Sequence, residues 1–348
     1  MNILFIGDVV GQKSCANLRE KLPLLKKEYN IDTVIVNGEN SADGNGITPV
    51  TAKYLLESGA DVITTGNHCF RRKEMDAFYE TSDFVIRPAN FPDDVVGKGY
   101  TILDHGRYSV CVINLMGVVF MQNLENPFHC IDRILSEVKS KVIIVDFHAE
   151  ATSEKRALGH YLTGRVSAVL GTHTHVQTAD EEILGGHTGY ITDVGMTGVT
   201  DSVLGIKKEI IISNMMTGYP QRYEYADGDY FICGVVVSVD EKSGKTADVS
   251  RNSIGYITSA FRSTTFFSGC AAPRPPVRAN IVAPTASNTN AMVRNRLKRM
   301  TASKNGPARR IPSPDAAQER RPDSPRNRLR YFTQCLLANS PSRNSGSM

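Results

Sequence analysis

Short apolar runs alternate with helical stretches through the first 258 residues of the 348-residue chain. The pattern predicts strands at 3–7, 32–37, 61–66, 108–115, 141–147, 166–171 and 189–194, and helices near 15–28, 49–58 and 72–80. Continuous apolar strands separated by helices are typical of sheets that are covered on both faces. Runs at 230–240 and 244–250 predict a closing hairpin. We therefore expect an α/β protein with mixed strand pairing.

Residues 259–348 differ from the rest in composition. They carry 16 Lys or Arg and 3 Asp or Glu, whereas residues 1–258 carry 24 and 33. The segment is rich in Pro, Ser, Asn and Arg, and such a segment buries too little surface to offset the entropy lost on ordering. We predict one globular domain over 1–258 and a disordered basic tail over 259–348. The alternatives are a tail that weakly contacts RNA, or one foreign to the ancestral domain.

Several function classes find little support in the sequence. The sequence contains no apolar run of the roughly 18 residues that are needed to span a bilayer. The N-terminus lacks the basic region of a signal peptide. The seven scattered cysteines show no CxxC spacing, which predicts free thiols in a reducing cytoplasm. No phosphate-binding loop, dinucleotide fingerprint or nucleophile elbow occurs. ATP-dependent, NAD-dependent and serine-hydrolase chemistry are therefore not favoured.

Side chains that can bind metals follow five of the predicted strands. They are Asp8; Glu39 and Asn40; Asn67 and His68; His148; and His173 and His175. Ligands bind at the carboxyl ends of strands in open α/β sheets. Carboxylate, amide and imidazole groups without thiolate favour iron, manganese, zinc or cobalt. Taken singly, Asp8 could be a helix N-cap and His148 a core histidine, but the coincidence favours one metal site.

The pair His173 and His175 suggests two ions rather than one. In extended backbone, residues i and i+2 lie on the same side about 6.6 Å apart. Paired metal ions in hydrolytic sites are about 3.5–4 Å apart. We therefore expect each imidazole to bind a different ion.

The order GD, GEN, GNH, H, GTHTH resembles the calcineurin-like metallophosphoesterase superfamily. The stretches MNILFIGDVVG, VNGEN, RPANFP, DFHAEATSEK, GTHTHVQTAD and YITDVGMTG are similar to its YmdB-like bacterial branch, over roughly residues 1–250. The resemblance implies a four-layer α/β/β/α sandwich, with residues 1–258 as the metallophosphoesterase domain. It also implies a dinuclear centre, with iron expected first and manganese or zinc as alternatives.

The resemblance also implies a role for each side chain. One ion would be held by Asp8, Glu39, Asn40 and His175, the other by Glu39, Asn67, His148 and His173, and His68 would be the general acid. Val10 stands where the wider superfamily has a histidine, and Asn40 would supply the missing ligand. The sequence GNHCFRR departs from the family: Cys69 is interpreted as a packing residue, Phe70 as an aromatic group beside the substrate, and Arg71 as an added positive charge.

The implied activity is hydrolysis of 2′,3′-cyclic nucleotides to 3′-phosphates, by a metal-bridging hydroxide with a histidine acid. The alternatives are a phosphomonoesterase, a nuclease on RNA ends, or a signalling protein that acts through partners. The possibility of a homo-oligomer is left open.

Glu150 could orient a ligand histidine or start a helix, and Arg87 and Asn90 could form a rigid turn or approach phosphate. The remaining histidines, His105, His129, His160 and His187, are interpreted as surface or packing residues.

Overall fold

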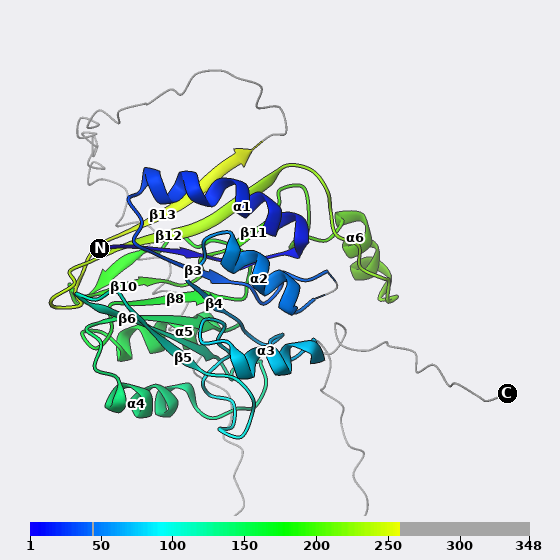
Figure 1. The fold of residues 1–348 in the computed structure, drawn as a ribbon. Helices are drawn as coiled ribbons and strands as arrows, with labels where there is room; N and C mark the ends of the chain where they lie inside the picture. Colours follow the sequence, from blue (N-terminus) through cyan, green and yellow to red (C-terminus); the bar gives the residue numbers. More distant parts are fainter. Residues whose placement is uncertain (44, 258–348) are drawn as a thin grey trace, which may run out of the picture. The chain divides into compact units, whose positions relative to one another are not determined.

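The computed structural model describes residues 1–43 and 45–257, of which 252–257 by backbone alone (Figure 1). The predicted disorder of 259–348 and its contact with RNA lie outside the described residues. No helix in the described part combines the length and the hydropathy that a membrane crossing requires.

Two β-sheets form the centre of the described residues. The seven-stranded sheet contains β1 (Asn2–Ile6), β2 (Asp8–Val9), β3 (Thr33–Asn37), β4 (Val62–Thr64), β11 (Met196–Val199), β12 (Tyr230–Val239) and β13 (Thr246–Ile257). The strand order is β2-β11-β12-β1-β3-β4, and β13 pairs with β12. The pairing is mixed, because β1, β3 and β4 run parallel whereas β12 is antiparallel to β1, β11 and β13. The predicted closing hairpin is therefore confirmed.

The six-stranded sheet follows the order β5-β6-β7-β8-β10-β9. Its strands are β5 (Tyr100–Asp104), β6 (Ser109–Met116), β7 (Val142–His148), β8 (Ala168–Thr172), β9 (Glu182–Leu184) and β10 (Thr188–Ile191). The four central strands are parallel and the two edge strands antiparallel. The carboxyl ends of β6, β7, β8 and β10 therefore lie at one edge.

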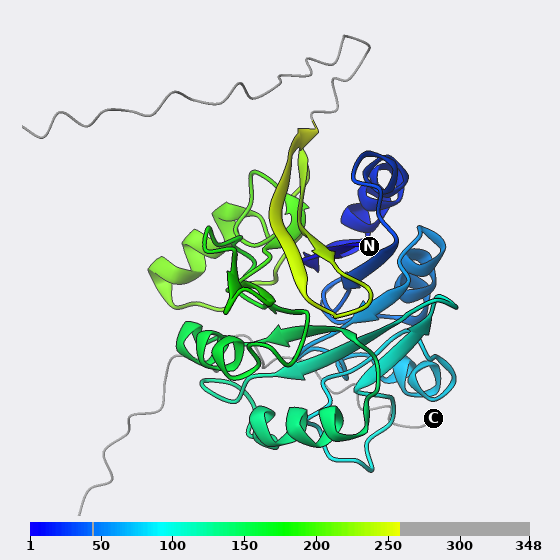
Figure 2. The same ribbon diagram turned by 90° about the vertical axis from the view of Figure 1, so that its left-hand side faces the viewer.

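Helices cover the outer face of each sheet (Figures 1 and 2). They are α1 (Gly11–Glu28), α2 (Pro49–Glu57), the 3-10 helix η1 (Lys73–Met75), α3 (Asp76–Thr81), α4 (Pro127–Glu137) and α5 (Thr152–Tyr161). A further helix, α6 (Lys208–Thr217), projects to one side in Figure 1. The start of α2 is encoded locally, because Thr48 and Thr51 form a reciprocal capping box and Pro49 occupies the first turn.

Alternate residues of the strands separate three apolar cores. Ile3 and Phe5 of β1 pack between the two sheets, whereas Leu4 and Ile6 pack beneath α1 and α2. In β6, Val112 likewise faces the space between the sheets, whereas Cys111 and Ile113 belong to the core beneath α4 and α5. This alternation follows from the two-residue period of a strand. The four-layer α/β/β/α sandwich implied by the family resemblance is confirmed.

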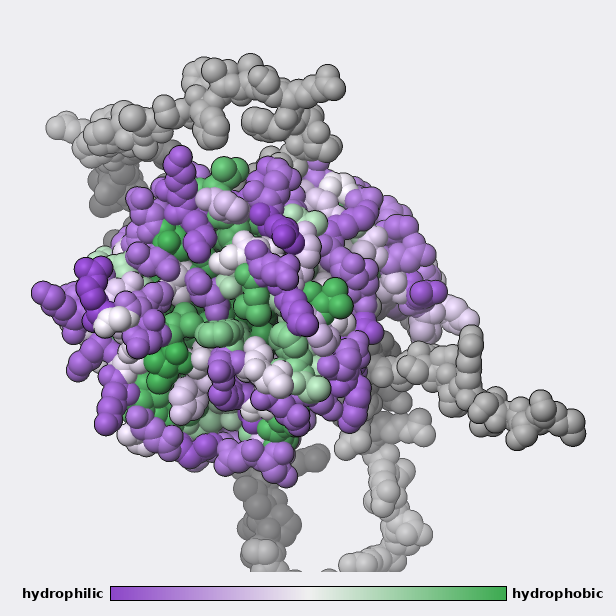
Figure 3. Space-filling model, in the orientation of Figure 1, coloured by the Kyte–Doolittle hydropathy of each residue, from purple (hydrophilic) through white to green (hydrophobic). Residues whose placement is uncertain are grey.

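Helix α6 contrasts with the covering helices, because none of its residues is buried. Met215 and Met216 are each about four-fifths exposed. Elsewhere, hydrophilic side chains occupy most of the face drawn in Figure 3, with smaller apolar areas between them.

Candidate metal centre

The eight predicted site residues lie together at the carboxyl ends of strands from both sheets. Asp8 begins β2 just after the end of β1, the 39–40 pair follows β3, and the 67–68 pair follows β4. His148 ends β7, and His173 and His175 follow β8. Since β7 and β8 belong to the second sheet, the cluster spans the edges of both.

One half of the cluster contains Asp8, Asn40 and His175. The Nε2 atom of His175 lies 3.2 Å from Nδ2 of Asn40 and 3.7 Å from Oδ1 of Asp8. The other carboxylate oxygen of Asp8 accepts a hydrogen bond from the backbone N–H of His173 at 3.2 Å. All three side chains are largely removed from solvent.

The other half contains Asn67, His148 and His173, with Glu39 between the halves. Three atoms surround Nε2 of His148: Oδ1 of Asn67 at 2.9 Å, Nδ1 of His173 at 3.0 Å and Oε1 of Glu39 at 3.2 Å. Ligand atoms of Glu39, His148 and His173 all lie within 4.8 Å of one another. Glu39 also reaches the first half, since its Oε1 accepts from Nδ2 of Asn40 at 3.1 Å.

The donor set fits the binding of metal ions. Oδ1 of Asp8 and Nδ1 of His175 are buried without a hydrogen-bond partner among the described residues. Such atoms are costly to leave unpaired. Around Nε2 of His148, three atoms with lone pairs face one position, and one proton cannot satisfy them all. Oxygen and imidazole ligands of this kind match iron, manganese or zinc.

Burial and mutual contact shift the pKa values of the cluster. Burial raises the pKa of Asp8 to about 7. Burial alone would raise the pKa of Glu39, but the adjacent His148 and His68 hold it well below its usual range. Burial would lower the pKa of His148, yet the Glu39 carboxylate raises it to about 9. Burial lowers the pKa of His173 to about 3, which keeps that imidazole neutral and able to bind a cation.

Gly66 leaves the space in which Glu39 and His148 approach each other. A Cβ atom at this position would lie 2.3 Å from Cδ2 of His148 and 2.4 Å from Oε2 of Glu39. Those distances are shorter than any unstrained contact, so a side chain here would push two proposed ligands apart. The glycine of GNH is therefore required by packing within the cluster.

His68 lies at the rim of the cluster, with a fifth of its side chain exposed. Its Nδ1 atom is 3.1 Å from Oδ1 of Asn40 and 3.2 Å from Oε1 of Glu39, and its Nε2 atom is 3.0 Å from Nδ2 of Asn67. The histidine thus contacts both halves and retains access to solvent.

A layer of buried polar groups beneath the cluster was not predicted. The Nδ1 atom of His148 lies 2.9 Å from the hydroxyl of Thr172, which in turn donates to Asp146 at 2.7 Å. The amide of Asn37 donates to the same carboxylate at 3.0 Å. These contacts fix the ring of His148 with Nε2 toward the cluster. Two polar residues inside apolar strands were the available signal: Asp146 in VIIVDFH and Asn37 at the end of VIVN.

Glu150 takes the first of the two roles considered for it. One of its oxygens lies 3.1 Å from Nε2 of His173, which leaves Nδ1 of that ring to face His148. The carboxylate therefore orients the imidazole. The N-cap of α5 is Ala151, so Glu150 does not cap the helix. Likewise Val10, and not Asp8, is the N-cap of α1.

The extended geometry expected for 173–175 is wrong. β8 ends at Thr172, and the φ angles of His173 and His175 are 104° and 65°. Positive φ is uncommon outside glycine and costs about 1–3 kcal/mol at such positions. The two imidazoles therefore reach different halves of the cluster through a tight turn and not through strand spacing.

The structure also bears on three secondary interpretations. The ring of Phe70 packs edge-to-face against Tyr79 and Phe91 and lies partly buried against the core, and its position beside the substrate stays a prediction. Arg87 is buried and donates to the carbonyls of 88, 92, 95 and 96, and buried Asn90 bonds the backbone of Met116. Both side chains therefore hold the predicted rigid turn together through bonds to the backbone.

The remaining predictions on packing are consistent with the structure. Cys69 is buried, and burial raises its thiol pKa. The ring of His105 stacks on Tyr108, away from the cluster.

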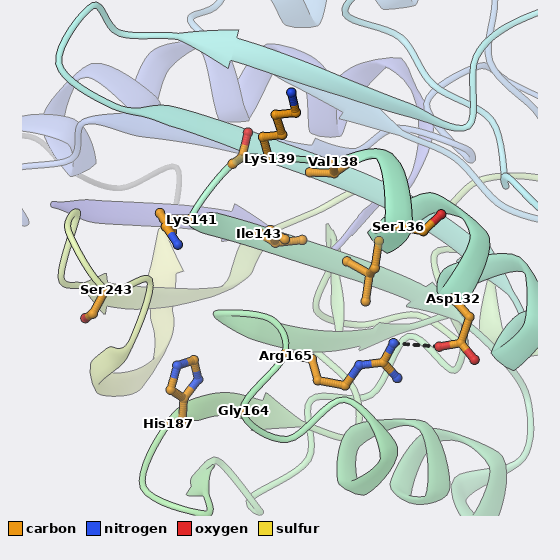
Figure 4. Close-up of a pocket in the computed structure, with 12 residues that line it drawn as sticks. Asp132, Ser136, Val138, Lys139, Lys141, Ile143, Gly164, Arg165, His187 and Ser243 are labelled. Carbon is orange, nitrogen blue, oxygen red and sulfur yellow. Dashed lines mark hydrogen bonds and ion pairs between the residues drawn. The ribbon is translucent and has the colours of Figure 1, made fainter.

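A separate concavity of about 750 Å³ lies at the amino ends of β7, β8 and β10, at the opposite edge of the sheet (Figure 4). Its Arg165 pairs with Asp132 at 2.6 Å, and none of the proposed ligands lines it.

Comparison with known proteins identifies the family. Residues 4–252 match the family described as YmdB-like protein. The chain belongs to the YmdB-like family. It is 46% identical over 253 residues to the 2′,3′-cyclic-nucleotide 2′-phosphodiesterase of Bacillus subtilis strain 168, covering 72% of this chain and 96% of that protein. The prediction of a YmdB-like metal-dependent phosphoric ester hydrolase is confirmed.

Solved structures agree with the fold of this YmdB-like chain. A hypothetical protein from Thermus thermophilus is 41% identical with a TM-score of 0.69, covering 72% of this chain and 98% of its own. A novel phosphatase from Mycoplasma pneumoniae is 31% identical with a TM-score of 0.70, covering 74% of this chain and 94% of its own.

Proposed function

We propose that this chain is a dinuclear metal-dependent phosphodiesterase that opens 2′,3′-cyclic nucleotides to 3′-phosphates. The observation that carries the proposal is the two-part cluster joined by Glu39, in which Oδ1 of Asp8 is buried without a partner and several oxygen and nitrogen atoms crowd around Nε2 of His148. The substrate class comes from the Bacillus subtilis relative, which is 46% identical.

The proposed ligands divide as the halves of the cluster do. Asp8, Glu39, Asn40 and His175 would hold one ion, and Glu39, Asn67, His148 and His173 the other. Bound ions in such a site lower the pKa of water and neutralise charge on phosphoryl oxygens. The side chains beneath and beside the site, Thr172 and Glu150, keep the imidazoles turned toward it.

His68 is the proposed general acid. It lies at the solvent side of the cluster and contacts both halves, so one of its ring nitrogens could deliver a proton to the 2′ oxygen as that oxygen leaves. The contacts to Asn40 and Asn67 keep the ring beside both halves, and one of them would have to be released for a ring nitrogen to reach the substrate.

Removing the imidazole of His68 separates catalysis from metal binding. We expect His68→Ala to retain its metal ions, measured by elemental analysis, while kcat falls by about 10²–10⁴-fold, the range of general-acid catalysis. His105→Ala is the matched control, because that histidine contacts Thr33 and Tyr108 outside the cluster. Unchanged turnover in His68→Ala would contradict the assigned role.

Parallel assays of three substrates test the activity itself. Turnover of 2′,3′-cyclic AMP, a phosphomonoester and a short RNA should be fastest for the cyclic nucleotide, with 3′-AMP as product. The phosphomonoesterase or the RNA-end nuclease would be the better assignment if the cyclic nucleotide were the poorest of the three.

Metal affinity should weaken as the pH falls. Binding requires Asp8 ionised and His148 neutral, and the pKa values of these groups are about 7 and about 9 in the metal-free protein. Each proton that must leave weakens apparent affinity by about tenfold per pH unit below its pKa. Calorimetric titration with Mn²⁺ at pH 6 and pH 8 should therefore show weaker binding at pH 6, with proton release. Equal affinity at both values would contradict the proposed ligands.

Iron as the native metal and a cytoplasmic location remain part of the proposal. The oxygen and imidazole donor set supports iron, manganese and zinc alike, and the buried free cysteines of the described residues suit a reducing compartment. The proposal covers each copy of the chain by itself and requires no second copy.

A further inference from the structure

A buried ion pair lies behind the turn that carries two of the proposed ligands. Nζ of Lys155 is 2.8 Å from Oδ2 of Asp193, and the exposed fractions of the two side chains are 1% and 0%. Lys155 belongs to α5, which follows the strand that ends in His148, and Asp193 follows β10. A buried pair of this kind is weak evidence for stability, because desolvation offsets much of the attraction. Its position therefore calls for another explanation.

The carboxylate of Asp193 is occupied by the turn between His173 and His175. Its Oδ2 atom accepts hydrogen bonds from both the backbone N–H of Thr174 at 3.0 Å and the Thr174 hydroxyl at 2.7 Å. Its Oδ1 atom accepts from the N–H of Gly195 at 2.8 Å. With Lys155, four donors converge on one carboxylate, so its orientation is fixed.

The backbone of residues 193–195 makes further hydrogen bonds, to the turn that carries the histidines and to Asp8. Asp193 exchanges hydrogen bonds with Thr178 at 2.9 and 3.0 Å, which ties down the far end of the turn. The carbonyl of Gly195 accepts from the N–H of Asp8 at 3.0 Å. The segment thus contacts the turn of the second sheet and the proposed ligand of the first.

We propose that Asp193, held by Lys155, positions His173 and His175 for metal binding. The two histidines adopt positive φ angles, a conformation that costs free energy and persists only when its surroundings enforce it. Thr174 is the residue between them, and its two bonds to Asp193 enforce the turn from its centre. Asp193 is thereby a positioning residue for both ions. This inference rests on the proposed metal site.

Thr174 offers the cleanest test, because substituting Lys155 or Asp193 leaves a buried charge unpaired and destabilises the whole fold. In metal-free full-length protein, we expect Thr174→Val to raise the Mn²⁺ dissociation constant by about tenfold or more, the lower range for groups that orient metal ligands. Thr174→Ser, which keeps the hydroxyl, should bind Mn²⁺ as the wild type does. Calorimetric titration measures both affinity and stoichiometry.

Thr163→Val is the matched control. The hydroxyl of Thr163 donates to the carbonyl of Gly159 at 3.1 Å after α5, so this variant loses a comparable bond outside the turn and should keep wild-type affinity. Wild-type Mn²⁺ binding by Thr174→Val would overturn the positioning role while leaving the metal site intact. Absence of Mn²⁺ binding by the wild type would overturn the metal site and this inference with it.

Discussion

Replacing Glu39 by Gln is expected to lower kcat/KM for 2′,3′-cyclic AMP by about 10³-fold. Paired metal ions supply several kcal/mol of charge stabilisation in phosphoester hydrolysis, and each 1.36 kcal/mol corresponds to a factor of about ten. Glu39 is the one proposed ligand shared by both ions, and its buried carboxylate contacts His68, His148 and Asn40. A neutral amide there removes the charge that both cations need, so the metal content should fall in parallel.

Glu154→Gln is the control for this substitution. Glu154 is also a buried glutamate, but its oxygens accept from the backbone of Val118 and Val119 outside the cluster. This variant should keep its metal ions and most of its turnover. Full activity of Glu39→Gln with two bound ions would contradict the proposal that Glu39 is the ligand shared by both ions.

Adding a single methyl group at Gly66 is expected to abolish metal binding while the fold persists. The new Cβ would lie 2.3 Å from Cδ2 of His148 and 2.4 Å from Oε2 of Glu39, and both side chains must shift to accommodate it. Overpacking of this kind costs about 1–3 kcal/mol of stability, which a domain of this size tolerates. Circular dichroism should therefore report a folded protein, and elemental analysis should report little or no bound metal.

Gly198→Ala provides a comparison for the steric effect. A Cβ at Gly198 would meet only the flexible side chain of Met196, at 3.2 Å, so this variant should bind metal as the wild type does. Normal metal content in Gly66→Ala would show that metal binding does not depend on the close approach of Glu39 and His148.

Much of the architecture was predictable from local patterns. The alternation of Ile3, Leu4, Phe5 and Ile6 between two cores follows from the strand period. The sequence also placed all eight polar side chains of the cluster at strand ends, which the structure brings together. Several elements were not predicted, among them α4 and α5, and β2, with two residues, is too brief to show a period. α6 was missed as well, because it lacks an amphipathic pattern and buries no residue.

The supporting residues of the site could not be predicted in the same way. Asp146 is an interior residue of β7, and Asp193 and Lys155 become neighbours only when α5 and the segment after β10 pack together. Such contacts depend on long-range packing. The turn at His173 and His175 was missed because the backbone conformation is imposed by these buried partners and opposes the local preference of the chain.

The number of metal ions bound per chain tests the central claim most directly. Elemental analysis of wild-type protein reconstituted with Mn²⁺ and freed of excess metal should find about two ions per chain, as paired-ion hydrolytic sites require. A value of one would contradict the division of ligands around Glu39. A value of zero would contradict the metal centre itself.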